Sequence, residues 1–153
     1  MPAADELRYA RDYHYLVEQR FGSAFGLRQN LPPELEGLYM PPGSLQTALE
    51  NVYKHNLATE RNPVTITLEA RDNALYVTND FSPKPGDLAT HERSGSGVAN
   101  LLRRYSLLTD DDVYARREGE QWVARLPLLA ASPADAAAPT ISQARNRVDQ
   151  LSP

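Results

Sequence analysis

One stretch of the chain carries polar side chains whose types and spacing could do chemistry together. It is residues 41–56, PPGSLQTALENVYKHN, which open on prolines as helices often do. Winding the stretch at about 100° per residue separates an apolar stripe from a polar face. The stripe consists of Leu45, Ala48, Leu49, Val52 and Tyr53, and the polar face of Thr47, Glu50, Asn51, Lys54 and His55. An acid, an amide, a cation and an imidazole therefore share one face, although the solvated side of an amphipathic helix is the alternative for this stretch taken alone.

A second polar feature is the glycine-rich sequence Ser94-Gly95-Ser96-Gly97, which leads directly into a predicted helix. A glycine-rich turn at a helix N-terminus presents free N–H groups beside the positive end of the helix dipole. Glycines also let the backbone approach an anion closely. A flexible turn before a helix would give the same pattern, so the glycine-rich turn indicates an anion site only in combination with the polar face of 41–56.

Together the two features predict a phosphate and metal site. The amide oxygen of Asn51 suits Mg²⁺, which takes a few protein oxygens plus phosphates. Lys54 suits phosphate oxygens. Glu50 suits accepting a proton or holding a metal-bound water.

The site needs a scaffold, and the hydrophobic periodicity of the chain indicates one. Helical spacing predicts a helix over 5–21, and alternation predicts an antiparallel hairpin of 64–70 with 75–78. The other expected elements are a short strand within 24–30, a helix over 98–108 and a hairpin of 113–117 with 121–126. Such strands, with helices that cover one face, make a two-layer α+β sandwich. Residues 79–94 show no periodicity, and a long loop of this kind is often a functional lid.

Length and composition exclude several function classes. The chain has 153 residues and a net charge of −4 with scattered Lys and Arg, which fits one domain and argues against a general nucleic-acid or membrane-surface binder. It has no cysteine, which excludes disulfides, thiolate chemistry and zinc–thiolate sites, and no apolar run long enough to span a bilayer. We expect a helical lead-in over 1–22, a main domain over 23–129 and a flexible Ala/Pro-rich tail over 130–153.

The order of these motifs resembles the catalytic, ATP-binding domain of sensor histidine kinases, whose fold is shared with the gyrase and heat-shock chaperone ATPases, and it looks most like the LytS-type bacterial kinases. That family's first motif is P-P-x-x-L-Q-x-L-x-E-N-A-x-K-H followed by G or N, and this chain reads PPGSLQTALENVYKHN. Its glycine motif is G-x-G-L-x-N-x-x-x-R-L, against GSGVANLLRRY here. Upstream, ELRYARDYHYLVEQRFG is similar to the family's Y-x-x-x-E-x-x-R-F helix, and the resemblance covers about residues 6–129.

The resemblance implies a fold, two ligands and a set of roles. The fold is a sandwich of a mixed, mostly antiparallel sheet with helices on one face, and the ligands are ATP and Mg²⁺. Asn51 would ligate Mg²⁺, and Glu50 would act as a base or orient a water. The residues implied to lie along the phosphates are Lys54, His55, Gly95, Ser96 and Gly97. Asn100 and Arg104 fall on the family's N and R, where helix packing is the alternative.

The chain departs from the family where the adenine base would bind. The family carries D-x-G-x-G after the second strand, and its Asp receives the adenine amino group, whereas this chain has Thr78-Asn79-Asp80-Phe81-Ser82. Strand alternation puts Asn79 on the face of Leu75 and Val77, toward the helices, so we expect Asn79 rather than Asp80 in the adenine position. The Asn carbonyl can accept the hydrogen bond without the charge assistance of an Asp, so adenine selectivity or affinity is expected to fall. Val98 replaces the family's Leu, a milder change.

A second departure concerns the phosphoacceptor. None of His14, His55 and His91 sits in the family's P-H-F-x-x-N-type motif. The resemblance therefore implies a protein-histidine kinase catalytic domain that transfers the ATP γ-phosphoryl group to a histidine on an upstream dimerisation helix outside this chain. A response regulator would be the later acceptor, and the segment would be cytoplasmic within a membrane-anchored parent.

Two other functions stay open at this point. One is a degenerate nucleotide-binding or docking module without phosphoryl transfer, which the altered adenine segment favours and the intact Glu50 and Asn51 oppose. The other is a protein kinase or partner-binding switch of the anti-sigma type, which the LytS-like helix at 6–22 opposes.

Overall fold

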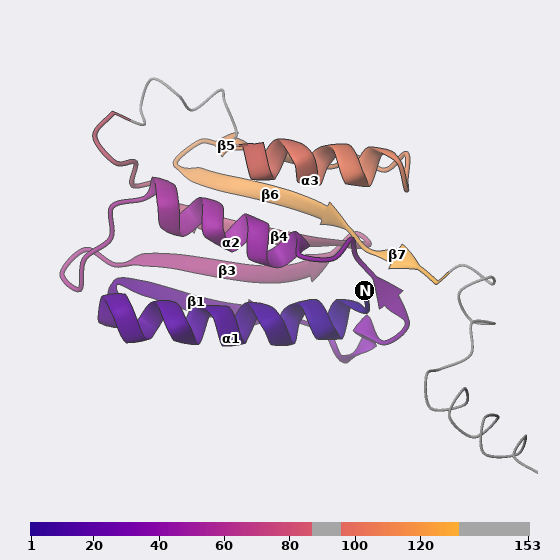
Figure 1. Ribbon diagram of the computed structural model, residues 1–153, viewed down its shortest axis with the longest axis horizontal. Helices are drawn as coiled ribbons and strands as arrows, with labels where there is room; N and C mark the ends of the chain where they lie inside the picture. The colour runs from indigo at the N-terminus through magenta and orange to yellow at the C-terminus, as the bar shows by residue number, and fades with distance from the viewer. Residues whose placement is uncertain (87–95, 132–153) are drawn as a thin grey trace, which may run out of the picture.

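The structure is a computed structural model that describes residues 1–86 and 96–131 (Figure 1). The predicted lid from residue 87 on, Gly95, and the predicted tail from residue 132 on lie outside the described residues. The described helices are α1 (Ala3–Phe21), α2 (Ser44–His55) and α3 (Ser96–Ser106), with short 3-10 turns at Gly22–Ala24 and Pro33–Leu35. The described strands are β1 (Phe25–Asn30), β2 (Leu38–Tyr39), β3 (Val64–Arg71), β4 (Ala74–Asp80), β5 (Tyr114–Glu118), β6 (Gln121–Pro127) and β7 (Leu129–Ala130).

The main sheet has five strands in the order β1-β3-β4-β6-β5. The β1–β3 pair is parallel, and the other pairs are antiparallel. Figure 1 shows α1, α2 and α3 side by side on one face of this sheet. The predicted α+β fold with a mixed, mostly antiparallel sheet is therefore confirmed, as are both predicted hairpins.

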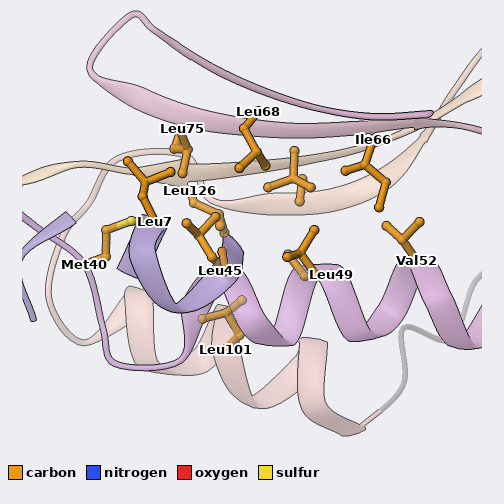
Figure 2. Close-up of a cluster of buried hydrophobic side chains, with 14 of the residues drawn as sticks. Leu7, Met40, Leu45, Leu49, Val52, Ile66, Leu68, Leu75, Leu101 and Leu126 are labelled. Carbon is orange, nitrogen blue, oxygen red and sulfur yellow. The ribbon is translucent and has the colours of Figure 1, made fainter. Parts of the chain in front are cut away.

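The core lies between the three helices and the covered face of the sheet, as Figure 2 shows. Leu45, Leu49 and Val52 are fully buried, which confirms the predicted stripe of α2. They meet alternate residues of β3, β4 and β6, among them Ile66, Leu68, Leu75 and Leu126. Each large aliphatic side chain buried in this way contributes about 1.5–3 kcal/mol of transfer free energy. Because the apolar stripe packs against the sheet, the polar face of α2 points away from the sheet.

The N-terminal end of α2 is held by the neighbouring helices. Prolines 41 and 42 precede the helix, and Gly43 is its N-cap residue with a φ of 75°, in the left-handed region that favours glycine. The Glu6 carboxylate of α1 accepts hydrogen bonds from the backbone N–H of Gly43 at 2.6 Å and of Leu45 at 3.0 Å. Arg104 of α3 donates to the Pro42 carbonyl at 2.6 Å. A carboxylate at a helix N-terminus satisfies free N–H groups and the helix dipole, so these contacts fix the orientation of α2.

The C-terminal end of α2 is tied to the chain that follows β4. Asn56 donates to the Val52 carbonyl at 2.9 Å and accepts from the Ser82 N–H at 3.0 Å. The Lys84 N–H donates to the His55 carbonyl at 3.2 Å. The polar face of α2 and the end of β4 are therefore held in one fixed arrangement.

Three details differ from the expected elements. Helix α3 begins at Ser96, inside the glycine-rich sequence, and Val98 in its first turn is buried. Strands β2 and β7 pair as a separate two-stranded sheet, and two-residue strands carry no detectable alternation. Ala130, the first residue assigned to the tail, lies in β7 and pairs with Leu38.

Candidate functional site

A surface pocket of about 260 Å³ lies between α2 and the start of α3. Its walls are Thr47, Glu50, Asn51, Lys54 and His55 from α2 and Ser96, Gly97 and Val98 from α3. The fold thus brings the polar face of α2 against the described part of the glycine-rich sequence, about 40 residues later in the chain. Of the other sequence-predicted site residues, Gly95 is not described, and Asn79 does not line this pocket.

The α2 side of the pocket follows from helical periodicity. Because the apolar stripe faces the sheet, Glu50 and Lys54 are exposed, and Asn51 and His55 are half-buried. Glu50 Oε1 accepts a hydrogen bond from Gln46 Nε2 at 2.9 Å, one turn earlier on the same helix. Acceptor oxygens, an ammonium group and an imidazole are therefore available to a ligand in this pocket.

The α3 side of the pocket is the first turn of a helix. Ser96 and Gly97 are exposed, and N–H groups in a first helical turn lack partners within the helix. A Cβ built on Gly97 would lie 3.6 Å from Thr47 Cγ2, an ordinary contact, so packing within the protein does not require glycine there. The N–H groups and the helix dipole make this end of the pocket attractive to an anion.

The described residues contain no cluster of three or more acidic, histidine or cysteine side chains that could hold a metal ion. Among the residues that line the pocket, Asn51 offers an amide oxygen of the kind that suits Mg²⁺, which also takes oxygen ligands from phosphates and water.

Asn79 lies at the end of β4 and faces the helices, as alternation predicted. It is paired in register with Ile66 of β3 and Trp122 of β6, and its side chain is 1% exposed. Ile66 packs toward Val52 of α2 in Figure 2, which puts Asn79 under the C-terminal half of that helix. Its Nδ2 donates to the Asp80 carbonyl at 2.7 Å, and its Oδ1 has no hydrogen-bond partner among the described residues. A buried acceptor without a partner is rare in folded proteins and marks this position for attention.

A second groove, which the sequence did not predict, runs between α1 and α2 beside the pocket. It has a volume of about 460 Å³ and is lined by Tyr13, Leu16, Val17, Arg20, Phe21, Glu50, Tyr53 and Lys54. Below it, the buried His14 Nδ1 lies 2.6 Å from the Tyr53 hydroxyl. Burial lowers the pKa of His14, with the nearby Glu18 carboxylate acting in the opposite direction, and burial raises the pKa of Tyr53. Tyr53 lies 39 residues after His14, so this contact depends on the tertiary arrangement of α1 and α2.

Comparison with known proteins gives two related sequences. The sensor protein LytS of Staphylococcus haemolyticus is 26% identical over 112 residues, which cover 65% of this chain and 19% of that protein. The sensor protein LytS of Bacillus subtilis is 25% identical over 117 residues, which cover 68% of this chain and 20% of that protein. This chain is distantly similar to LytS sensor proteins. The chain spans about a fifth of the length of these relatives.

Comparison with family models and with solved structures gives the following results. No family model matches the chain. A crystal structure of the histidine kinase ThkA in complex with the response regulator protein TrrA aligns with 83% of this chain and 40% of that chain. The TM-score of that alignment is 0.46 with 10% sequence identity. In the described part of the chain, no helix has the length and apolar composition needed to cross a membrane.

Proposed function

We propose that this chain is the ATP-binding catalytic domain of a two-component sensor histidine kinase. It would bind Mg·ATP between α2 and α3, and the parent protein would transfer the γ-phosphoryl group to a histidine on an upstream dimerisation helix. A response regulator would then receive the phosphoryl group. In this proposal the domain would lie in the cytoplasm, as part of a membrane-anchored parent protein. The observation that carries the proposal is the pocket in which the polar face of α2 meets the start of α3.

The residues of the pocket fit a metal–triphosphate ligand. Ser96 and Gly97 would offer N–H groups to phosphate oxygens at the positive end of α3. The Lys54 ammonium, on a flexible side chain, would neutralise phosphate charge, with the His55 imidazole beside it. Asn51 would supply an amide oxygen to Mg²⁺, whose other ligands would be phosphate oxygens and water. Bound Mg²⁺ would neutralise charge as the phosphoryl group leaves.

The remaining roles concern Glu50 and the base. Glu50 would accept a proton or orient a water at the open side of the pocket, with Gln46 holding one of its oxygens. The unpartnered Asn79 Oδ1 fits a ligand that brings an N–H donor, as the adenine amino group does. In this proposal, 23–129 would be the catalytic domain and 1–22 its lead-in helix, and the part of the predicted tail that follows Ala130 of β7 would be the tail.

A nucleotide-binding or docking module without phosphoryl transfer is the second candidate. Two observations favour it: a neutral Asn79 stands where the resembling family has a carboxylate, and Glu50 is exposed and engaged by its helix neighbour Gln46. Both candidates require nucleotide binding and differ only in whether the phosphoryl group moves.

Calorimetric titration with Mg·ATP tests the shared step. We expect wild-type binding to require Mg²⁺ and to fall at least about tenfold in Asn51→Ala, the factor equivalent to ~1.4 kcal/mol. Asn30→Ala, at an exposed position in β1 away from the pocket, is the matched control and should bind as wild type does. Equal binding by Asn51→Ala and the control would refute the site. Transfer of label from γ-³²P-ATP to the histidine segment of the parent protein then separates the two candidates.

A further inference from the structure

Buried side chains of α1 make polar contacts with both halves of α2. Glu6 caps the first turn of α2. His14 contacts the second half, where its Nδ1 lies 2.6 Å from the Tyr53 hydroxyl. That half also carries Asn51 and Lys54 of the pocket, and Lys54 directly follows Tyr53 in the chain. The position of these pocket residues relative to α1 is therefore set in part by the contact between His14 and Tyr53.

The second ring nitrogen of His14 decides the direction of that hydrogen bond. Nε2 is buried, has no hydrogen-bond partner among the described residues, and lies 3.5 Å from Glu18 Oε1 on the next turn of α1. Because a carboxylate only accepts hydrogen bonds, the neutral ring is stabilised with its proton on Nε2, facing Glu18. Nδ1 is then the acceptor, and the Tyr53 O–H donates to it.

Protonation of His14 reverses this arrangement. A proton on Nδ1 removes the acceptor that the Tyr53 O–H uses, so the hydroxyl must turn its hydrogen away from the ring. The charged ring is at the same time attracted to the Glu18 carboxylate on its own helix. The neutral imidazole therefore joins α1 to α2, whereas the imidazolium favours a contact within α1.

The surroundings of His14 favour the neutral ring. In the described part of the chain, the titratable side chains that face it are Glu18 of α1 and Tyr53 of α2, and Tyr13 packs against the Tyr53 ring. Strand β1 contributes the apolar ring of Phe25, whose centroid lies 5.0 Å from that of Tyr53. Burial lowers the pKa of His14 by more than the Glu18 carboxylate raises it, so the ring is neutral at pH 7.5.

We propose that His14 is a positioning residue for the nucleotide pocket, which holds the second half of α2 through Tyr53 while its ring is neutral and releases it when the ring is protonated. The inference rests on the proposed nucleotide-binding function and adds a regulation of that site by pH. Neither residue lines the pocket, so the effect on Mg·ATP passes through the orientation of α2. Loss of one hydrogen bond corresponds to about threefold to tenfold in affinity.

The pH dependence of Mg·ATP binding tests the proposal on this chain. We expect the wild-type affinity, measured by calorimetric titration, to fall about threefold to tenfold more between pH 7.5 and pH 5.0 than the affinity of His14→Asn does. An asparagine keeps an acceptor near the position of Nδ1 and does not titrate. The other titrating groups, such as His55 in the pocket and the nucleotide itself, are the same in both proteins, so the comparison isolates His14.

Variants at pH 7.5 test the contact without protonation. Tyr53→Phe removes only the hydroxyl, and His14→Leu removes the acceptor, so each should weaken Mg·ATP binding about threefold to tenfold. His14→Asn should bind within about twofold of wild type, because it keeps the acceptor. Tyr15→Phe removes an exposed hydroxyl from α1 and is the matched control, which should bind as wild type does at both pH values. Circular dichroism at each pH restricts the comparison to folded protein.

A second readout separates positioning from a merely structural role. If protonation of His14 weakens Mg·ATP binding, bound Mg·ATP must oppose that protonation by the same factor. The pH midpoint of the His14 ring signals in NMR should therefore fall by about 0.5–1 when Mg·ATP is saturating. A His14 that only supports the fold would titrate at the same pH with and without the nucleotide.

The possible results lead to different conclusions. If wild type and His14→Asn lose affinity equally between the two pH values, or if Mg·ATP leaves the NMR midpoint unchanged, this inference is refuted and nucleotide binding stands. If Tyr53→Phe binds Mg·ATP as tightly as Tyr15→Phe at pH 7.5, the contact does not position α2 and the inference is likewise refuted. If wild type binds no Mg·ATP at either pH, the proposed function fails and this inference fails with it.

Discussion

The carboxylate of Glu6 makes a sharp prediction about what positions the pocket. Its side chain is 3% exposed and accepts two backbone N–H groups at the start of α2, from Gly43 and Leu45. Replacing Glu6 by Ala leaves both N–H groups without their acceptor. Hydrogen bonds to charged groups contribute about 1.5–3 kcal/mol each, and loss of an N-terminal cap costs about 0.5–2 kcal/mol. We expect the free energy of unfolding to fall by about 3 kcal/mol in Glu6→Ala.

Glu6→Gln is expected to lower the free energy of unfolding by less than Glu6→Ala. The glutamine keeps one carbonyl acceptor of nearly the same reach but loses the charge and the second oxygen, so we expect about half the loss, ~1.5 kcal/mol. Asp12→Ala, which removes an exposed carboxylate from the same helix, is the matched control and should change stability by less than about 0.5 kcal/mol.

Urea denaturation measures all three variants. With an m-value of roughly 2 kcal/mol/M, a loss of 3 kcal/mol lowers the midpoint by about 1.5 M urea at unchanged m. If Glu6→Ala and Asp12→Ala unfold at the same midpoint, water replaces the carboxylate without cost, and the reasoning about α2 is refuted. If the midpoint falls as expected, Mg·ATP affinity under native conditions should fall in Glu6→Ala as well, because the same contacts orient the polar face of α2.

Two further predictions concern the rest of the site. Burial lowers the pKa of His14, so the folded state binds fewer protons than the unfolded state once the pH falls below the unfolded pKa of about 6.5. The contribution of His14 to stability is therefore fully present above that pH and is lost as the pH falls below it. Urea midpoints measured from pH 5 to 8 should consequently fall less in His14→Gln than in wild type. A Cβ on Gly97 has room beside Thr47, so Gly97→Ala should gain roughly 0.5–1 kcal/mol in thermal or urea unfolding while it weakens Mg·ATP binding by narrowing the approach to the α3 N-terminus. A Gly97→Ala variant that binds Mg·ATP as wild type does would argue against phosphates at that turn.

Local periodicity predicted those parts of the fold that depend on neighbours in sequence. The stripe through Leu45, Leu49 and Val52 identified α2, and alternation through β4 put Asn79 on the helix face. Local periodicity could not predict the pairing of β1 with β3. The two strands are parallel and are joined by a long connection, so their pairing depends on the tertiary structure. The capping of α2 by Glu6 could not be predicted from local sequence either, because the carboxylate lies 37 and 39 residues before the N–H groups that it accepts.

The candidate site divides in the same way. The polar face of α2 could be predicted because helical geometry alone collects Glu50, Asn51 and Lys54. That this face meets Ser96 and Gly97 was a hypothesis drawn from the complementary chemistry of the two segments and from the family resemblance, since nothing local in either segment specifies the other. The state of the Asn79 amide could not be predicted at all, because its orientation depends on the position of one backbone carbonyl.

The small β2–β7 sheet has a consequence for where the pocket lies relative to the two ends of the described chain. Pro2 bridges to Tyr39, and Tyr39 also pairs with Leu129, so the first and last described segments meet at one edge of the molecule (Figure 1). That edge lies at the N-terminal end of α2, whereas Asn51, Lys54 and His55 lie toward the other end, roughly 10–15 Å away along the helix. The first and last described segments therefore lie at the opposite end of α2 from these pocket residues.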